Sequence, residues 1–319
     1  MNAWTQHGGQ LERAREAFGE GDEPWIDLST GINPQPWPDV AQLTIDWARL
    51  PDAGALSDLE VAAGKYFGAD PACVLAIPGT EIGLRMLGAH LPRPIRYLRP
   101  SYSSHGEIAP DALPADAADA GAGALILANP NNPDGRVTPV TMLRAQMARG
   151  WLVIDEAFAD SDPRHSFAGE VREGAPLIVL RSFGKFFGLA GVRLGFLLAP
   201  PRPIADFRAR LGAWPVSAAA IAIGTAAYRD ASWIEAERAR LKDASAALDR
   251  LLEAHGYTPI GDCPLFRLIE TDNANALFER LARRSILTRP FDYDPRWLRI
   301  GLPADADAFA RLDSALADG

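Results

Sequence analysis

Lysine is the residue type that this chain of 319 residues most clearly lacks. Lys65, Lys185 and Lys242 are the only lysines among 32 basic residues, so the other 29 are arginines. Arginine stays protonated in proteins, whereas a lysine amine can lose its proton in a suitable environment. Chemistry that needs a neutral amine is therefore restricted to three positions.

Cysteine and long apolar runs are also scarce. Cys73 and Cys263 lie far apart in sequence and have no Cys or His at ligand spacing, which excludes a disulfide framework and a zinc site and favours a cytoplasmic protein. The longest small and apolar stretch, 216–228, is shorter than the ~20 residues of a spanning helix. The N-terminus lacks the basic and apolar regions of a signal peptide. We therefore expect neither secretion nor membrane insertion.

Acidic residues outnumber basic ones, and the net charge is −9. Nucleic acids and anionic lipids attract clustered positive charge, so this balance argues against both partners. Apolar residues make up 48% of the chain, which is enough to bury a large core. A small-molecule partner is the remaining expectation.

Apolar runs and helical patterns alternate along the middle of the chain, which predicts an α/β fold with a mainly parallel central sheet. The predicted strands lie at 74–79, 95–100, 124–130, 151–158, 177–185 and 193–200. The rest of the chain predicts helices at 207–228, 233–255, 275–284 and 305–318, with strands at 265–269 and 297–302. We expect an irregular N-terminal arm over 1–50, a large α/β domain over 51–205, and linking helices with a smaller α+β domain over 206–319.

Polar residues of unusual kinds follow several of these strands. Gly79, Thr80 and Glu81 stand between a strand and a helix, where free N–H groups can bind a phosphate, although such a turn taken alone is more often a simple helix cap. Asparagines follow the strand that ends near 130, and Asp155 ends the next strand. Ligands in open α/β sheets bind beyond the carboxyl ends of strands. These residues are therefore candidates for one site.

Lys185 is the lysine that lacks a simple structural explanation. Lys65 stands near a helix end and Lys242 among many charges, but Lys185 follows a buried strand in a loop rich in Gly and Phe. Desolvation disfavours the ammonium form, as a Schiff-base amine requires. An amine, a carboxylate, a phosphate-binding turn and an asparagine are together the groups that a pyridoxal-phosphate site requires.

The order of these motifs resembles a known family. Gly-Thr-Glu, Pro-Ser-Tyr, Asn-Pro-Asp-Gly, Asp-Glu-Ala-Phe, Ser-Phe-Gly-Lys with an arginine eight residues later, and Leu-Arg-Ile follow one another along the chain. The same order is typical of the fold-type I pyridoxal-phosphate enzymes, the aspartate aminotransferase superfamily. The resemblance covers nearly the whole chain and implies that fold, a large domain with a mainly parallel sheet and a smaller C-terminal domain, and a homodimer.

The resemblance also implies a role for each matching residue. Lys185 would be the imine lysine, Asp155 would pair with the pyridine nitrogen, and Asn132 with the ring oxygen. The implied phosphate-binding residues are Gly79, Thr80, Ser182 and Arg193, with Glu81 lining the same turn. Tyr102 would stack on the ring, and Arg299 would bind the substrate carboxylate with its planar fork of donors. No metal is implied.

Further motifs resemble the threonine-phosphate decarboxylases of cobalamin biosynthesis, whose nearest relatives are histidinol-phosphate aminotransferases. These motifs are HGGQLERA (7–14), DLSTGINP (27–34), WPVS (214–217) and ILTRPF (286–291). The resemblance implies decarboxylation of L-threonine O-3-phosphate to (R)-1-aminopropan-2-yl phosphate. The implied substrate-binding residues are His7, Gly8, Gly31, Asn132, Arg289 and Arg299.

Three positions depart from the patterns of these relatives. Phe158 stands where aminotransferases commonly have a tyrosine that bonds the ring oxygen, which is compatible with a decarboxylase as well as with a transaminase. Gly31 replaces a common asparagine, and Leu50, Pro51 and Asp52 stand where many relatives have a tyrosine that reaches the cofactor phosphate of the partner subunit. The phosphate is therefore expected to depend more on Arg193 and Ser182.

Other functions stay open from the residues alone. Histidinol-phosphate aminotransferase is the first alternative, because the residues do not reveal which bond to the substrate Cα breaks. A cofactor-free binding protein on the same fold is the second. A nucleotide-binding α/β module is disfavoured, since neither GxGxxG nor GxxxxGK[ST] occurs.

Overall fold

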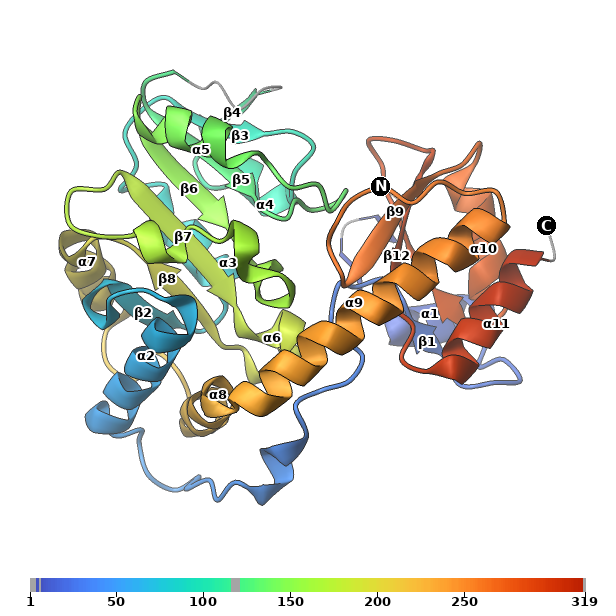
Figure 1. The fold of residues 1–319 in the computed structure, drawn as a ribbon, viewed down its shortest axis with the longest axis horizontal. Coiled ribbons are helices and arrows are strands. Elements are labelled where there is room, and N and C mark those ends of the chain that lie inside the picture. The colour runs from blue at the N-terminus through green and yellow to red at the C-terminus, as the bar shows by residue number, and fades with distance from the viewer. Residues whose placement is uncertain (1–3, 6, 116–120, 318–319) are drawn as a thin grey trace. The chain divides into compact units, whose positions relative to one another are not determined.

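The computed structural model describes residues 4, 5, 7–115 and 121–317, and the chain divides into two units (Figure 1). The large unit comprises residues 36–132 and 137–236. The small unit comprises the described residues up to 35, residues 133–136 and those from 237 onward. No helix in the described part of the chain is both long and apolar enough to cross a membrane.

The large unit is built on a seven-stranded sheet with the order β2-β8-β7-β6-β5-β3-β4. Its strands are β2 (Val74–Ile77), β3 (Ile95–Leu98), β4 (Leu113–Ala115), β5 (Ala124–Ala128), β6 (Trp151–Asp155), β7 (Leu177–Ser182) and β8 (Gly195–Leu198). All neighbouring strands are parallel except β8, which runs antiparallel to both β2 and β7. The predicted α/β fold with a mainly parallel sheet is confirmed.

The central strands are unbroken apolar runs because both faces of the sheet are covered. Every residue of β2, β5 and β8 is buried, as expected for strands between two layers of helix. The helices of this unit are α2 (Ala53–Phe67), α3 (Thr80–Leu87), α4 (Ser103–Gly106), α5 (Val140–Met147), α6 (Phe183–Phe186), α7 (Pro201–Leu211) and α8 (Ala218–Arg229). The stretch predicted as one helix over 207–228 forms two, because Gly212 and Pro215 interrupt the pattern.

Short 3-10 turns connect several of these elements. They are η1 (Pro38–Gln42), η2 (Pro71–Cys73), η3 (Ala159–Ser161), η4 (Pro163–His165), η5 (Ala168–Glu170) and η6 (Ala190–Val192). Three of them, η3, η4 and η5, follow β6, and η6 lies between α6 and β8. The segments after the carboxyl ends of β6 and β7 are therefore tightly wound rather than extended.

The small unit contains an antiparallel sheet with the order β11-β12-β9 and a separate parallel pair, β1-β10. Its strands are β1 (Ile26–Asp27), β9 (Phe266–Glu270), β10 (Ile286–Leu287), β11 (Arg289–Pro290) and β12 (Trp297–Gly301). Its helices are α1 (Leu11–Phe18), α10 (Ala274–Ala282), α11 (Ala306–Ala317) and the residues of α9 (Ala231–Ala254) from 237 onward. The N-terminal segment, predicted to be irregular, thus contributes a helix and a strand.

Candidate active site

Several strands of the large unit end at one edge of the sheet. Gly195, the first residue of β8, pairs with Ile77 at the end of β2 and with Ser182 at the end of β7. Asp155 at the end of β6 pairs with Ala128 at the end of β5. The residues predicted from strand ends therefore collect along one carboxyl edge, where ligands bind in open α/β sheets.

The turn between β2 and α3 forms a cradle for an anion. Gly79 has φ +90°, and no side chain caps the N-terminus of α3 that follows it. A Cβ on Gly79 would lie 2.6 Å from the Nη2 atom of Arg193, so only glycine lets this guanidinium approach the turn. The cradle therefore combines a guanidinium with the positive end of a helix, starting at Thr80.

Asp155 is buried beside a histidine that the sequence analysis did not select. The Nε2 atom of His105 lies 3.3 Å from the Oδ2 atom of Asp155, and the side chains are 0% and 7% exposed. The ring of His105 also meets the ring of Tyr102 edge-on at 5.9 Å. The spacing Tyr-x-x-His, one turn of α4, is the signal that could have revealed His105.

Lys185 is half-buried in α6, between the buried side chains of Phe183 and Phe186. Its Nζ atom lies 5.8 Å from the ring centroid of Phe158, which is itself buried. Lys65 and Lys242 are exposed. Lys185 is thus the one of the three lysines that lies among buried aromatic side chains.

A buried ion cluster, formed by Arg181, Glu156 and Asp160, lies on the segments that carry Asp155 and Lys185. The Nη1 atom of Arg181 donates to Glu156 Oε2 at 2.8 Å, and its Nη2 atom pairs with Asp160. The backbone N–H of Phe167 donates to the other Glu156 oxygen at 2.6 Å. One guanidinium therefore holds both ends of the 156–160 loop, which contains Phe158.

Glu81 lies at the predicted turn, but its carboxylate contacts Tyr102. The hydroxyl of Tyr102 donates to Glu81 Oε2 at 3.2 Å, and Ser104 donates to Oε1 at 3.1 Å. Burial raises the pKa of the Tyr102 hydroxyl, so this group donates as a neutral phenol. Arg85 also pairs with Glu81, at 2.9 Å. Glu81 thus orients Tyr102.

Asn132 is half-buried in the loop after β5. Its neighbours fix the loop: Asn131 donates to the carbonyl of Pro100 at 3.0 Å, and Asn129 accepts from the N–H of Thr138 at 2.9 Å. Ser182 is half-buried at the end of β7, and Arg193 follows η6 with φ +56°. These placements are those of a carboxyl-edge site.

The small unit holds the two arginines predicted to bind substrate. Arg289 and Arg299 are direct partners across β11 and β12, and they are 8% and 2% exposed. Burial, with the guanidinium of Arg289 close by, lowers the pKa of Arg299 to about 9. Two like charges held together out of water repel each other, and a bound anion relieves that repulsion.

The N-terminal residues of the predicted substrate site belong to the same unit. His7 is exposed, Gly8 is half-buried and Gly31 is buried. The Nε2 atom of Gln10 donates to the carbonyl of His7 at 2.9 Å. The side-chain amide of Asn33 donates to the carboxylate of Glu237 at 2.7 Å, which is a structural contact within the unit.

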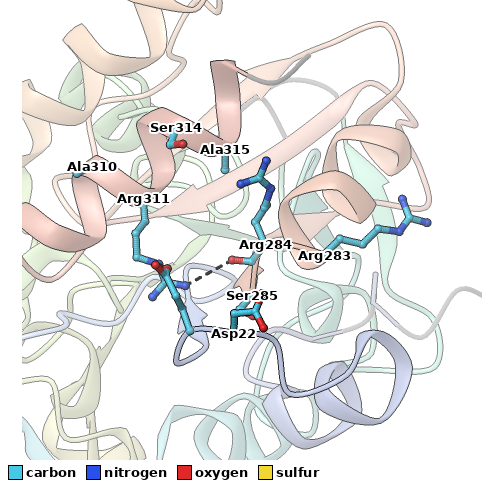
Figure 2. A pocket seen from close by; sticks show the side chains of 9 residues that line it. Asp22, Arg283, Arg284, Ser285, Ala310, Arg311, Ser314 and Ala315 are labelled. Atoms are coloured by element: carbon cyan, nitrogen blue, oxygen red, sulfur yellow. Dashed lines mark hydrogen bonds and ion pairs between the residues drawn. The ribbon is translucent and has the colours of Figure 1, made fainter.

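The small unit also has a surface pocket of about 390 Å³ (Figure 2). Arg311 pairs there with Glu23 and donates to the carbonyls of Pro24 at 2.8 Å and Arg284 at 3.4 Å. Arg283 points away from this contact and pairs with Glu279 at 3.0 Å. Arg311 thus joins α11 to the segment before β1, and we assign the pocket no catalytic role. Within residues 4, 5, 7–115 and 121–317, no group of three metal-ligating side chains occurs.

Comparison with known proteins agrees with this geometry. Residues 82–310 match the family model described as aminotransferase class I and II. Threonine-phosphate decarboxylases of Sinorhizobium sp and Pseudomonas aeruginosa are each 40% identical to the chain; the matches cover 99% and 98% of the chain and 99% and 97% of those proteins. The crystal structure of histidinol-phosphate aminotransferase from Sinorhizobium meliloti, in complex with pyridoxal-5'-phosphate, superposes with a TM-score of 0.82 at 20% identity, covering 97% of this chain and 94% of that one.

Proposed function

Because the chain belongs to the class I and II aminotransferase family, we propose that it is a pyridoxal-phosphate-dependent decarboxylase. Its substrate is L-threonine O-3-phosphate, its products are carbon dioxide and (R)-1-aminopropan-2-yl phosphate, and its place is in cobalamin biosynthesis. The decarboxylase relatives support this choice. The observation that carries it is the buried pair Arg289 and Arg299, which suits a substrate with two anionic groups.

The residues of the large unit fit pyridoxal phosphate. The cradle of Gly79 and Arg193 at the uncapped start of α3 suits a phosphate. Asp155 supplies a buried carboxylate for the ring nitrogen, and Lys185 supplies an amine among phenylalanines. The remaining residues that we propose to hold the cofactor are Thr80, Tyr102, Asn132 and Ser182, with Glu81 positioning Tyr102.

Several residues hold the cofactor, transfer the proton and orient the substrate. When bound, pyridoxal phosphate supplies an electron-accepting ring that stabilises negative charge at the substrate Cα. Asp155 keeps a proton on the ring nitrogen, and His105 orients Asp155. Lys185 holds the cofactor and then moves a proton to Cα after carbon dioxide has left. Since Arg and carboxylate groups pair through two parallel hydrogen bonds, Arg299 fixes the direction of the bond that breaks.

Arg289, the second arginine of the buried pair, is the group that we assign to the substrate phosphate. We propose that Arg289 and His7 bind it, with Gly8 and Gly31 allowing close approach of the backbone. Interactions with such a remote group can be used to orient the reacting bond. The amino acid without its phosphate should therefore react poorly.

A paired substrate assay tests the function. Purified protein with pyridoxal phosphate is expected to release carbon dioxide from L-threonine O-3-phosphate without any keto acid. Conversion of histidinol phosphate that depends on a keto acid would instead establish the aminotransferase alternative. This alternative is tested because a histidinol-phosphate aminotransferase has the same fold. Protein that stays colourless with pyridoxal phosphate, and is unaffected by Lys185→Ala, would support a cofactor-free binding protein.

We further propose a homodimer that acts in the cytoplasm. The large unit has a surface hollow of about 620 Å³ lined by residues such as Leu50, Ile221 and Ala222. Leu50 and the nearby Trp47 are 65% and 78% exposed. A second copy would cover these apolar groups. Cys73 and Cys263 are both buried thiols, in keeping with a reducing compartment.

Arg289→Met is expected to improve stability while weakening substrate binding. The substitution removes one of two buried like charges, so the melting temperature should rise by roughly 2–4 °C. It also removes charged hydrogen bonds to the phosphate, so KM for threonine phosphate should rise roughly 10- to 100-fold. Thermal unfolding and steady-state kinetics measure the two effects. Arg283→Met, an exposed arginine of the same unit, serves as the matched control; an unchanged KM in Arg289→Met would exclude this role.

A further inference from the structure

Ser29 joins two parts of the proposed substrate site within the small unit. The Nη2 atom of Arg299 donates to the carbonyl of Ser29 at 2.9 Å. The N–H of Gly9 donates to the Ser29 hydroxyl oxygen at 2.8 Å. Ser29 is 2% exposed, so the Arg299 contact is made out of water, whereas Gly9 lies at the surface. Ser29 therefore contacts the carboxylate-binding arginine through its backbone and the first residues of the N-terminal arm, at Gly9, through its side chain.

Asp27 fixes the orientation of the Ser29 hydroxyl. The hydroxyl donates to Asp27 Oδ1 at 2.5 Å, and the N–H of Ser29 donates to the same oxygen at 2.8 Å. With its proton directed to Asp27, the hydroxyl oxygen presents a lone pair to Gly9. The charge of Asp27 also favours the protonated form of Arg299.

The backbone on either side of Ser29 is held by the strands. The N–H of Leu28 donates to the carbonyl of Leu287 at 2.7 Å, and the N–H of Gly301 donates to the carbonyl of Leu28 at 2.7 Å. Leu28 thus bridges β10 and β12, the strand that carries Arg299. Ser29 cannot shift without disturbing these bonds.

The arm is docked closely against this segment. A Cβ on Gly8 would lie 2.4 Å from the backbone oxygen of Ser29, which no side chain tolerates. Farther along the arm, the ring of Trp4 packs against Phe278 at 5.5 Å. His7 therefore lies in sequence between two anchored positions.

We propose that Ser29 is a positioning residue that docks the first residues of the N-terminal arm, around Gly8 and Gly9, beside Arg299. His7 and Arg299 then act on one substrate molecule. The inference rests on the proposed function only for the identity of that substrate. The docking itself concerns the protein without substrate.

Hydrogen exchange and kinetics on the full chain test the proposal. In Ser29→Ala, amide exchange in peptides covering residues 4–18 should accelerate roughly tenfold, because the Gly9 N–H loses its acceptor. KM for threonine phosphate should rise roughly tenfold with kcat within twofold, because the arm no longer stays at the substrate. Gly8→Ala tests the same contact from the opposite side and should accelerate exchange similarly. Ser314→Ala, the same chemical change on exposed α11, should alter neither measurement.

The outcomes separate this proposal from the proposed function. Exchange that is unchanged in both Ser29→Ala and Gly8→Ala overturns the proposal, as does faster exchange with an unchanged KM. Should Ser29→Ala fail to fold, the exchange of Gly8→Ala decides. A wild-type protein that releases no carbon dioxide from threonine phosphate refutes the proposed function instead, and the exchange comparison then still decides whether Ser29 docks the arm.

Discussion

Lys185→Ala is expected to lower the rate of carbon dioxide release by roughly 10³-fold or more. The variant loses the amine that we propose to hold the cofactor and to return a proton to Cα, and proton transfer alone contributes roughly 10²- to 10⁴-fold. Lys185→Arg should fail similarly, because a guanidinium keeps its positive charge but supplies no neutral amine. Single-turnover release of carbon dioxide is the measurement.

The scarcity of lysine gives this experiment clean controls. Lys65 and Lys242 are exposed, and replacing either by alanine should leave the rate unchanged. Borohydride reduction of the wild-type protein with pyridoxal phosphate, followed by peptide mass spectrometry, should place the label on Lys185. A label on another lysine, or full activity in Lys185→Ala, would refute the assignment.

Asp155→Asn should lower the rate by roughly 10²- to 10³-fold, the usual cost of losing one aligned electrostatic group. The amide has nearly the same size and can still bond His105, so the fold should persist. It cannot stabilise a proton on the ring nitrogen, and the ring then accepts electrons less well. The rate and the melting temperature should be measured together.

Asp206→Asn is the matched control, because Asp206 is exposed on α7. Its rate should equal that of the wild-type protein. If Asp155→Asn keeps its rate, Asp155 has no electrostatic role. If it loses its melting transition as well, the loss is one of folding, and Asp155→Glu should then be compared.

The carboxyl-edge site could be predicted because its signals are local. Gly79 and Lys185 follow strands, and Asp155 ends one, that are recognisable from unbroken apolar runs. Parallel pairing aligns the ends of β6 and β7, and β8, antiparallel to both β2 and β7, aligns the ends of those two strands. The twist and order of the sheet did not have to be known. The proposed roles of these residues come from the family resemblance, and the structure adds the side chains that surround each of them.

The contacts of the small unit could not be predicted in the same way. β1, β10 and β11 have two residues each, too few for any periodic pattern. The link from Ser29 to Arg299 spans 270 positions of sequence. His105 was missed for a different reason: Tyr102 was selected from the sequence, but the residue one helical turn onward, whose ring lies 3.3 Å from Asp155, was not considered.

The buried Arg181 cluster has a consequence for how the protein acquires its cofactor. Because Glu156 and Asp160 are both tied to one buried guanidinium, the loop between them is held in a fixed shape without any ligand. Binding of the cofactor therefore costs little conformational entropy for ordering this loop. Apoprotein should consequently reconstitute by simple mixing, with recovery limited by diffusion and covalent attachment instead of by refolding.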